Sequence, residues 1–139
     1  MTNQAVVTGA TGFLGQHLTR ELFRRGFEVT LVTHQMEKAK AIFNDQPVHR
    51  IIGLSQNPSA ALDIPSGAAI FHCGAITGAV HTRKKDYTAA NVDWTCQLLQ
   101  LAIQNKAVSF TFISSLSAVG AQGSARDPIT EKTTPKPRT

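Results

Sequence analysis

The stretch AVVTGATGFLG at residues 5–15 decides the fold that this chain can adopt. It begins with a short apolar run of the kind that builds a buried strand, and three glycines follow with the spacing GxxGxxG. From Leu14 to Leu22 a leucine recurs at every fourth residue, which predicts an amphipathic helix that ends at Gly26. A strand, a glycine loop and a helix in this order make one βα unit.

The glycine loop predicts a binding site for the pyrophosphate of a dinucleotide. Gly9 permits the tight turn out of the strand, Gly12 lets the backbone approach the phosphates, and Gly15 lets the helix pack closely on the sheet. The first amides of the helix and the positive end of its dipole then face the phosphates. The predicted cofactor-binding residues of this loop are Gly9, Thr11, Gly12, Phe13, Leu14 and Gly15. A glycine-rich turn that binds no ligand is the alternative.

The rest of the chain alternates short apolar runs with helical patterns, which is typical of a parallel sheet. We expect further strands at residues 28–33, 48–52, 68–73 and 109–114, and further helices at 36–43 and 91–105. Right-handed crossovers favour the strand order 3-2-1-4-5. The sequence thus predicts a Rossmann-type, three-layer α/β domain over residues 1–120. Residues 121–139 hold one large apolar residue, Ile129, and we expect them to form a polar, mobile tail.

Length and composition restrict the function further. The 139 residues make one ordinary domain and leave no room for a separate substrate domain. The chain begins without a basic, apolar leader and has no apolar run of about eighteen residues, so we expect a cytosolic location and no membrane span. Cys73 and Cys96 lie too far apart for a redox or zinc pair, and the histidines show no ligand spacing, so no metal site is predicted. The net charge of +5 comes from scattered basic residues, which favours an anionic small molecule over nucleic acid.

Four stretches together resemble the amino-terminal half of the extended short-chain dehydrogenase/reductase family, which includes NAD(P)-dependent epimerases, dehydratases and dihydroflavonol-reductase-like proteins. They are VVTGATGFLGQHLTRELFRRGFEVTLVT at 6–33, IFHCGA at 70–75, NVDWTCQLL at 91–99 and FISSLSAVG at 112–120. The resemblance implies that NAD(P) lies over the carboxyl ends of the strands. It also implies hydride transfer beside a Ser/Thr, Tyr and Lys set, with a carbonyl compound or a nucleotide sugar as substrate.

By this resemblance Ser115 is the active-site serine. A tyrosine that exchanges a proton at neutral pH needs a nearby lysine and the positively charged cofactor. Tyr87 is the only tyrosine, and Asn91 rather than a lysine stands four residues after it. The last residues resemble the loop that precedes the family's YxxxK motif, so we expect the chain to be truncated before that motif. Two interpretations of Ser115 stay open, because it either orients a substrate or, with Ser114, satisfies backbone groups at the strand end.

The end of the second predicted strand bears on the choice between NAD and NADP. Thr33 and His34 stand where an acidic residue would select NAD, and Lys38 follows one helical turn later. We therefore predict a preference for NADP, with His34 and Lys38 near its phosphate. Alternatively, the Lys38 side chain is solvated and does not contact the phosphate. The family commonly has an Asp that contacts the adenine at the position of Leu54, so this chain departs from the family pattern there.

Three more residues complete the predicted cofactor site by resemblance. Gly74 and Ala75 are small where the family brings its backbone against the cofactor, although small residues also suit a crowded strand end. Asn91 is similar to the family's helix asparagine near the active site, although an asparagine at this position equally suits a helix N-cap.

Two functions follow as expectations. The first is an NAD(P)-dependent oxidoreductase, epimerase or dehydratase of which this chain is the cofactor-binding part, inactive alone. The second is a non-catalytic nucleotide-binding or interaction module derived from the same family. We also expect a homo-oligomer, through the uncovered edge of the last strand or through the helices around residues 80–103. One face of the helix predicted at 91–105 carries Val92, Cys96, Leu99 and Ile103.

Overall fold

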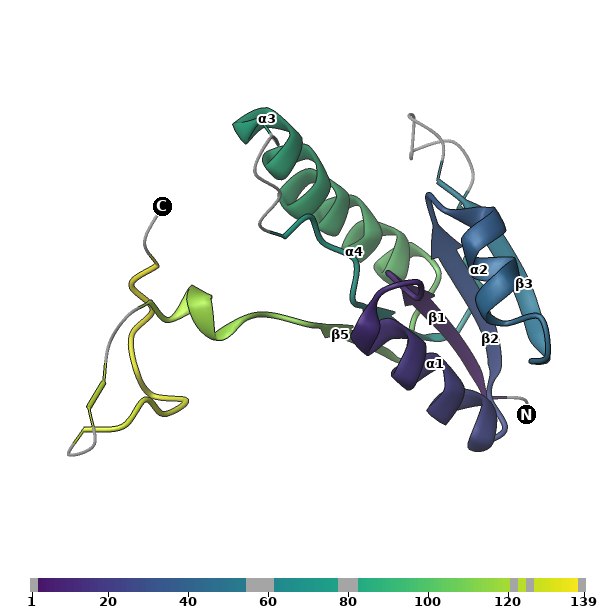
Figure 1. Cartoon of the computed structure of the whole chain (residues 1–139), viewed down its shortest axis with the longest axis horizontal. Coiled ribbons are helices and arrows are strands. Elements are labelled where there is room, and N and C mark those ends of the chain that lie inside the picture. The colour runs from purple at the N-terminus through teal and green to yellow at the C-terminus, as the bar shows by residue number, and fades with distance from the viewer. Residues whose placement is uncertain (1–2, 55–61, 78–82, 121–122, 125–126, 138–139) are drawn as a thin grey trace.

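The computed structural model describes residues 3–54, 62–77, 83–120, 123–124 and 127–137. Within these residues five strands form one parallel sheet in the order β3-β2-β1-β4-β5, as predicted (Figure 1). The strands are β1 (Gln4–Thr8), β2 (Glu28–Thr33), β3 (Val48–Gly53), β4 (Ala69–His72) and β5 (Ser109–Phe112). The chain crosses from the β3 edge to β4 on the other side of β1, so the strand order reverses next to β1. In open α/β sheets a ligand binds at such a reversal, beyond the carboxyl ends of the strands.

Helices cover both faces of the sheet (Figure 1). One face packs against α1 (Phe13–Arg24) and α2 (Met36–Ile42). The other face packs against a longer helix with three consecutive parts, α3 (Lys84–Tyr87), a π-helical turn η1 (Thr88–Asp93) and α4 (Trp94–Gln104). A π-helical turn is rare, and such turns often occur at functional sites.

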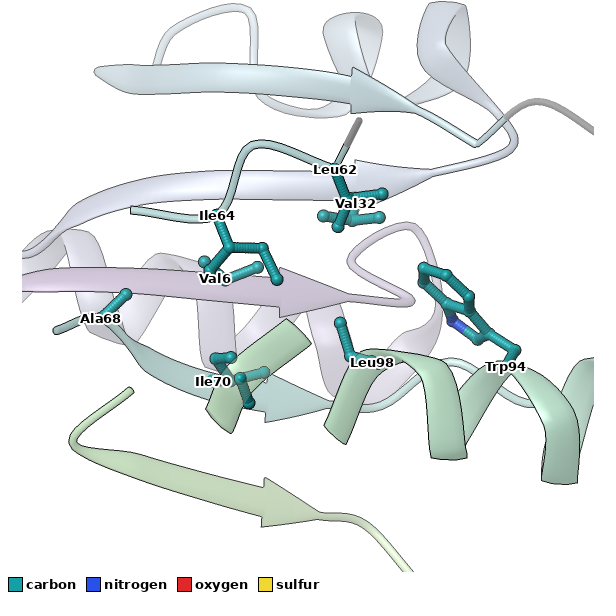
Figure 2. Packing of buried hydrophobic residues seen from close by; sticks show 9 residues of the cluster. Val6, Val32, Leu62, Ile64, Ala68, Ile70, Trp94 and Leu98 are labelled. Carbon is teal, nitrogen blue, oxygen red and sulfur yellow. The ribbon is translucent and has the colours of Figure 1, made fainter. Parts of the chain in front are cut away.

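The central strand β1 divides the core into two halves, because successive side chains of a strand point to opposite faces. Ala5 and Val7 are buried on the α1 side, whereas Val6 is buried on the α4 side. On the α4 side Val6 packs in a cluster with Ile70 of β4 and Leu98 of α4, as Figure 2 shows. A strand with apolar contacts on both faces is typical of a parallel sheet.

The end of α1 confirms the predicted glycine stop. Gly26 has a positive φ of 77°, its N–H donates to the Phe23 carbonyl, and the Phe27 N–H donates to the Leu22 carbonyl. These two bonds form a Schellman motif, which satisfies the last carbonyls of the helix. Glycine adopts the left-handed conformation of this motif without steric strain.

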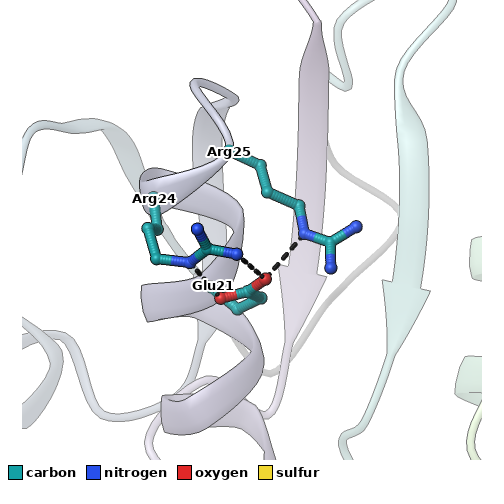
Figure 3. Close-up of polar contacts among 3 residues, drawn as sticks. All are labelled: Glu21, Arg24 and Arg25. Carbon is teal, nitrogen blue, oxygen red and sulfur yellow. Dashed lines mark hydrogen bonds and ion pairs between the residues drawn. The ribbon is translucent and has the colours of Figure 1, made fainter.

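An exposed ion-pair cluster lies on the same last turns of α1 (Figure 3). The Glu21 carboxylate accepts hydrogen bonds from Arg24 and Arg25, with N–O distances of 2.7 Å. These hydrogen bonds lower the pKa of Glu21 to about 2. All three side chains face solvent, so the cluster contributes little to stability.

The helix predicted at 91–105 begins earlier than expected and packs with another face. Its helical conformation starts at Lys84, because α3 and the π-helical turn precede α4. Leu98 is fully buried against the sheet, whereas Leu99 and Ile103 are 43% and 70% exposed. The apolar stripe predicted from the sequence therefore exists, but it faces away from the sheet. The helix has two apolar stripes, and the sheet buries the one that contains Trp94, Leu98 and Ala102.

After β5 the chain leaves the sheet and extends away from it (Figure 1). A 3-10 turn, η2 (Leu116–Ala118), follows, and the Lys136 N–H donates to the Val119 carbonyl. The tail predicted at 121–139 lies partly outside the described residues, as do residues 80–82 of the predicted oligomer contact. Across the described part of the chain, no helix is long and apolar enough to cross a membrane, and no group of three or more metal-binding side chains occurs.

Candidate functional site

A cavity of about 850 Å³ lies beyond the carboxyl ends of β1, β2 and β4. Its walls come from the glycine loop, the end of β2, the turn after β4 and the helix that contains the π-helical turn. Five predicted cofactor residues line it, namely Gly9, Thr11, His34, Gly74 and Ala75. The cavity thus lies where the strand order reverses, and the sequence predicted five of its lining residues.

The glycine loop is built by close backbone contacts. Gly9 has a φ of +69°, and a β-carbon on it would lie 2.6 Å from the Gly74 nitrogen. A β-carbon on Gly15 would collide with the Gly9 carbonyl oxygen, which explains why α1 needs a glycine in its first turn. Gly12 has an extended conformation at the N-cap of α1, and a β-carbon there would lie 3.3 Å from the Gly9 oxygen. Gly9 and Gly15 are therefore required by the fold, whereas a β-carbon on Gly12 would make one tight contact that a small shift can relieve.

The N-terminus of α1 is arranged to accept an anion. No side chain caps it, and its first turn holds no acidic residue. The first amides of a helix have no carbonyl partner within the helix, so those of Phe13 and Leu14 are available to a phosphate. Both side chains are exposed and do not line the cavity.

The turn after β4 is held by Asn91 of the π-helical turn. The Asn91 Oδ1 atom accepts a hydrogen bond from the Ile76 N–H at 2.8 Å, and its Nδ2 atom donates to the Ile76 carbonyl at 2.9 Å. Asn91 therefore neither lines the cavity nor caps a helix N-terminus. It fixes the backbone of Ile76, which does line the cavity.

The end of β2 places His34 but not Lys38 at the cavity. The His34 Nδ1 atom lies 3.2 Å from the Leu54 carbonyl oxygen, and both residues line the wall. Lys38 is exposed on α2 and is not among the lining residues, in keeping with the solvated alternative. The Thr33 hydroxyl accepts a hydrogen bond from the Gln35 N–H, which shapes the turn into α2.

Ser115 lies outside the cavity wall, beyond the end of β5. Its Oγ atom accepts a hydrogen bond from the Ser117 N–H at 3.2 Å and caps the 3-10 turn. This contact satisfies a backbone group, as the second interpretation of Ser115 expects. Tyr87 ends α3 and does not line the cavity either.

Sequence reasoning missed part of the wall and the polar contacts behind it. Further lining residues are Thr8, Val32, Thr33, Gln35, Leu54, Ile76, Asp86, Ala89, Ala90 and Trp94. Asp86 is the only carboxylate of this wall, and it forms an ion pair with Arg83 at 2.9 Å. Behind the wall, buried His72 forms hydrogen bonds with two threonines. The signal that could have indicated this contact is a histidine inside the apolar run at 68–73.

Comparisons with known proteins show the family to which this chain belongs. The family model described as the NAD dependent epimerase/dehydratase family matches residues 5–139. UDP-N-acetyl-alpha-D-glucosaminuronate decarboxylase of Bacillus cytotoxicus is 32% identical over 113 residues, which cover 76% of this chain and 35% of that protein. The chain therefore spans about a third of the length of this curated relative.

Solved structures share the fold. The structure of MoeE5 with UDP-glucose and NAD has a TM-score of 0.74 and 27% identity, and the match covers 97% of this chain and 43% of that one. The UDP-Glc/GlcNAc 4-epimerase of Campylobacter jejuni has a TM-score of 0.81 at 18% identity over 98% of this chain and 44% of its own. This chain belongs to the NAD-dependent epimerase/dehydratase family, and what it contains is the Rossmann-type, NAD(P)-binding part.

Proposed function

We propose that this chain binds the pyrophosphate of NAD(P) between the Gly9 loop and the N-terminus of α1. The observation that carries the proposal is the close contact of Gly9 with Gly74, two lining residues without side chains, in the loop that leads from β1 to α1 and the turn after β4. Backbone without side chains permits the close approach that a pyrophosphate requires, and the uncapped helix end supplies donors. The cavity residues therefore fit the cofactor that the family uses.

We further propose that NADP is preferred over NAD. Thr33 and His34 support this preference, because the end of β2 offers no carboxylate that would bind the ribose hydroxyls and repel a 2′-phosphate. His34 lines the cavity and is the candidate contact for that phosphate. Lys38 is exposed on α2 and does not support this preference.

The substrate class that we propose for the whole enzyme is a nucleotide sugar, since relatives with UDP-sugar names match this chain. The cofactor, when bound, supplies hydride transfer. The 139 residues contain no tyrosine followed four residues later by lysine. On their own they therefore bind dinucleotide but do not turn over a carbonyl or alcohol, because positioned proton transfer contributes typically ~10²–10⁴-fold.

Titration calorimetry of the chain with NAD⁺ and NADP⁺ tests the proposed site. We expect binding in the micromolar range or weaker, roughly 8 kcal/mol or less. Gly12→Val should abolish binding without unfolding the chain, because its side chain would occupy the place of the pyrophosphate. Ala118→Val, which introduces the same side chain in an exposed turn, should bind normally. No heat with either dinucleotide, or wild-type affinity of Gly12→Val, would refute the proposal.

The chain is also proposed to form a homo-oligomer. Exposed apolar side chains on α4 and at the edge strand β5 support this, among them Leu99, Ile103 and Phe112. Light scattering at high concentration tests it, and a single monomeric species would argue against it. A cytosolic location stays a prediction, in keeping with two free cysteines.

A further inference from the structure

His72 lies fully buried behind the cavity, between two threonines from other elements. Its Nδ1 atom is 2.6 Å from the Thr8 Oγ1 atom of β1, and its Nε2 atom is 2.8 Å from the Thr95 Oγ1 atom of α4. The imidazole therefore joins the end of the central strand to the helix on the α4 face. In the neutral ring one of these nitrogens donates and the other accepts, and the partners of the threonines decide which.

The hydrogen bonds of the two threonines fix that arrangement. The Thr95 hydroxyl donates to the Asn91 carbonyl at 2.8 Å, so it can only accept from the ring, and His72 must carry its proton on Nε2. The Nδ1 atom of the neutral ring is then an acceptor, so the Thr8 hydroxyl donates to it. The Thr8 oxygen in turn accepts the Gly74 N–H at 3.1 Å. All four bonds run in one direction, from the Gly74 amide to the Asn91 carbonyl.

This chain of bonds holds the cavity turn at both ends. Gly74 is bound through Thr8 and His72, and Ile76 is bound by the Asn91 side chain. Both sets of hydrogen bonds end on the same helix. Asn91 belongs to the π-helical turn and Thr95 follows just after it in α4, and both residues lie on the side of the helix that faces the sheet. The Gly74 backbone in turn lies against Gly9, so a shift of the turn changes the width of the glycine loop.

We propose that His72, in its neutral Nε2–H form, is a positioning residue of the dinucleotide site, which with Thr8 and Thr95 holds the turn at Gly74–Ile76 against the Gly9 loop. Protonation of the ring turns Nδ1 into a donor and leaves the Thr8 hydroxyl without its acceptor. The turn then loosens and dinucleotide binding weakens. This inference rests on the proposed dinucleotide binding, and its test distinguishes the two.

None of the described residues that contact the His72 ring is charged. Its ring contacts from β5 are Phe110 and Phe112, and its partners from β1 and α4 are uncharged threonines. Cys73 follows His72 directly after β4. Burial raises the pKa of its thiol, which keeps the thiol neutral. Asp93 is the nearest acidic residue along the helix sequence, and it is exposed. Burial accordingly lowers the pKa of His72 from its usual 6.5.

The first measurement uses the full chain without ligand. Long-range ¹H–¹⁵N spectra of the histidine side chains at about pH 8 report the tautomer, and we expect Nε2–H for His72. Amide exchange at Gly74 and Ile76 should accelerate in Thr95→Val, which removes the acceptor of the ring, and return towards the wild-type rate in Thr95→Ser. The control is Thr19→Val, because Thr19 is a helical threonine that is fully buried but whose hydroxyl has no partner in the described chain.

The second measurement is the affinity for NAD⁺ between about pH 5 and 8, in a His34→Gln background. His34 lines the cavity and is the candidate contact for the NADP phosphate, so this background removes its imidazole from the measurement. We expect Thr95→Val to bind about five- to tenfold more weakly than Thr19→Val at pH 8. We also expect the His34→Gln protein to lose affinity as the pH falls through the pKa of His72.

The outcomes separate the two hypotheses. If the wild-type chain binds no dinucleotide, the proposed function fails, and the ring tautomer and amide exchange still decide whether His72 holds the turn. An Nδ1–H tautomer, or equal amide exchange in Thr95→Val and Thr19→Val, would overturn the positioning role. Equal affinities of these two variants in a chain that binds NAD⁺ would overturn it as well. If Thr95→Val fails to fold, the tautomer and the pH profile of the His34→Gln protein decide the question.

Discussion

Gly9 and Gly74 meet backbone to backbone at the base of the cavity. A β-carbon on Gly9 would lie 2.6 Å from the Gly74 nitrogen and 2.7 Å from its α-carbon. The ends of β1 and β4 thus come so close together that neither loop can move without the other. We therefore expect stability and the proposed dinucleotide affinity to be linked at this contact.

A methyl group at Gly9 tests this linkage. We expect Gly9→Ala to lower the free energy of unfolding by more than about 3 kcal/mol or to prevent folding, because it adds a backbone collision to the strain of a positive φ. Gly26→Ala is the matched control, since Gly26 has a φ of +77° and nothing within 4 Å of an added β-carbon. It should cost about 1–2 kcal/mol, from φ alone. Urea denaturation measures both, and equal losses would contradict the close contact.

Neighbouring leucines on α4 test which stripe of the helix packs on the sheet. Leu98→Ala should lower the free energy of unfolding by about 2–5 kcal/mol, because Leu98 is fully buried between helix and sheet. Leu99→Ala should cost less than about 1 kcal/mol, since that side chain is largely exposed. Urea denaturation at low protein concentration separates the two. The reverse ranking would mean that the predicted stripe, and not the observed one, contacts the sheet.

Stability should fall when the pH drops below 6.5, because of His72. Burial lowers its pKa in the folded chain, so the unfolded chain binds a proton first as the pH falls. The contribution of His72 to the free energy of unfolding is fully present above the pKa that His72 has in the unfolded chain. It is lost as the pH falls from that value to the lower pKa in the folded chain. Denaturation of wild type and His72→Gln at about pH 8 and 5.5 measures this difference. A variant that loses as much stability as wild type on acidification would assign the effect to other groups.

The ion-pair cluster on α1 should matter little to the fold. The pKa of Glu21 is lowered to about 2 by Arg24 and Arg25, so any contribution is present above pH 4.5 and is lost as the pH falls towards 2. Because the cluster is exposed, we expect the melting temperatures of Glu21→Gln and wild type to agree closely at pH 7. A large drop in the melting temperature that salt does not reduce would contradict this.

Local sequence patterns predicted the frame of the molecule. The strand expected at 28–33 matches β2, and the helix expected at 36–43 differs from α2 by one residue at its end. The glycine loop indicated two residues that line the cavity, Gly9 and Thr11, and the right-handed crossovers led to the observed strand order. These features depend on residues within one turn or one loop of each other, so their periodicity is visible in the chain itself.

Tertiary structure decided the features that depend on distant residues. Thr8 and His72 are 64 positions apart, and Thr95 follows 23 positions after His72, so no local pattern could predict their contact. The sheet selected the stripe of α4 with Leu98, because only one of two apolar stripes can face it. Lys38 fits the NADP motif by spacing alone, yet α2 directs it to solvent because Ala39 takes the buried position of that turn. Sequence thus determined which elements form and in what order, while packing between them determined which side chains reach the cavity.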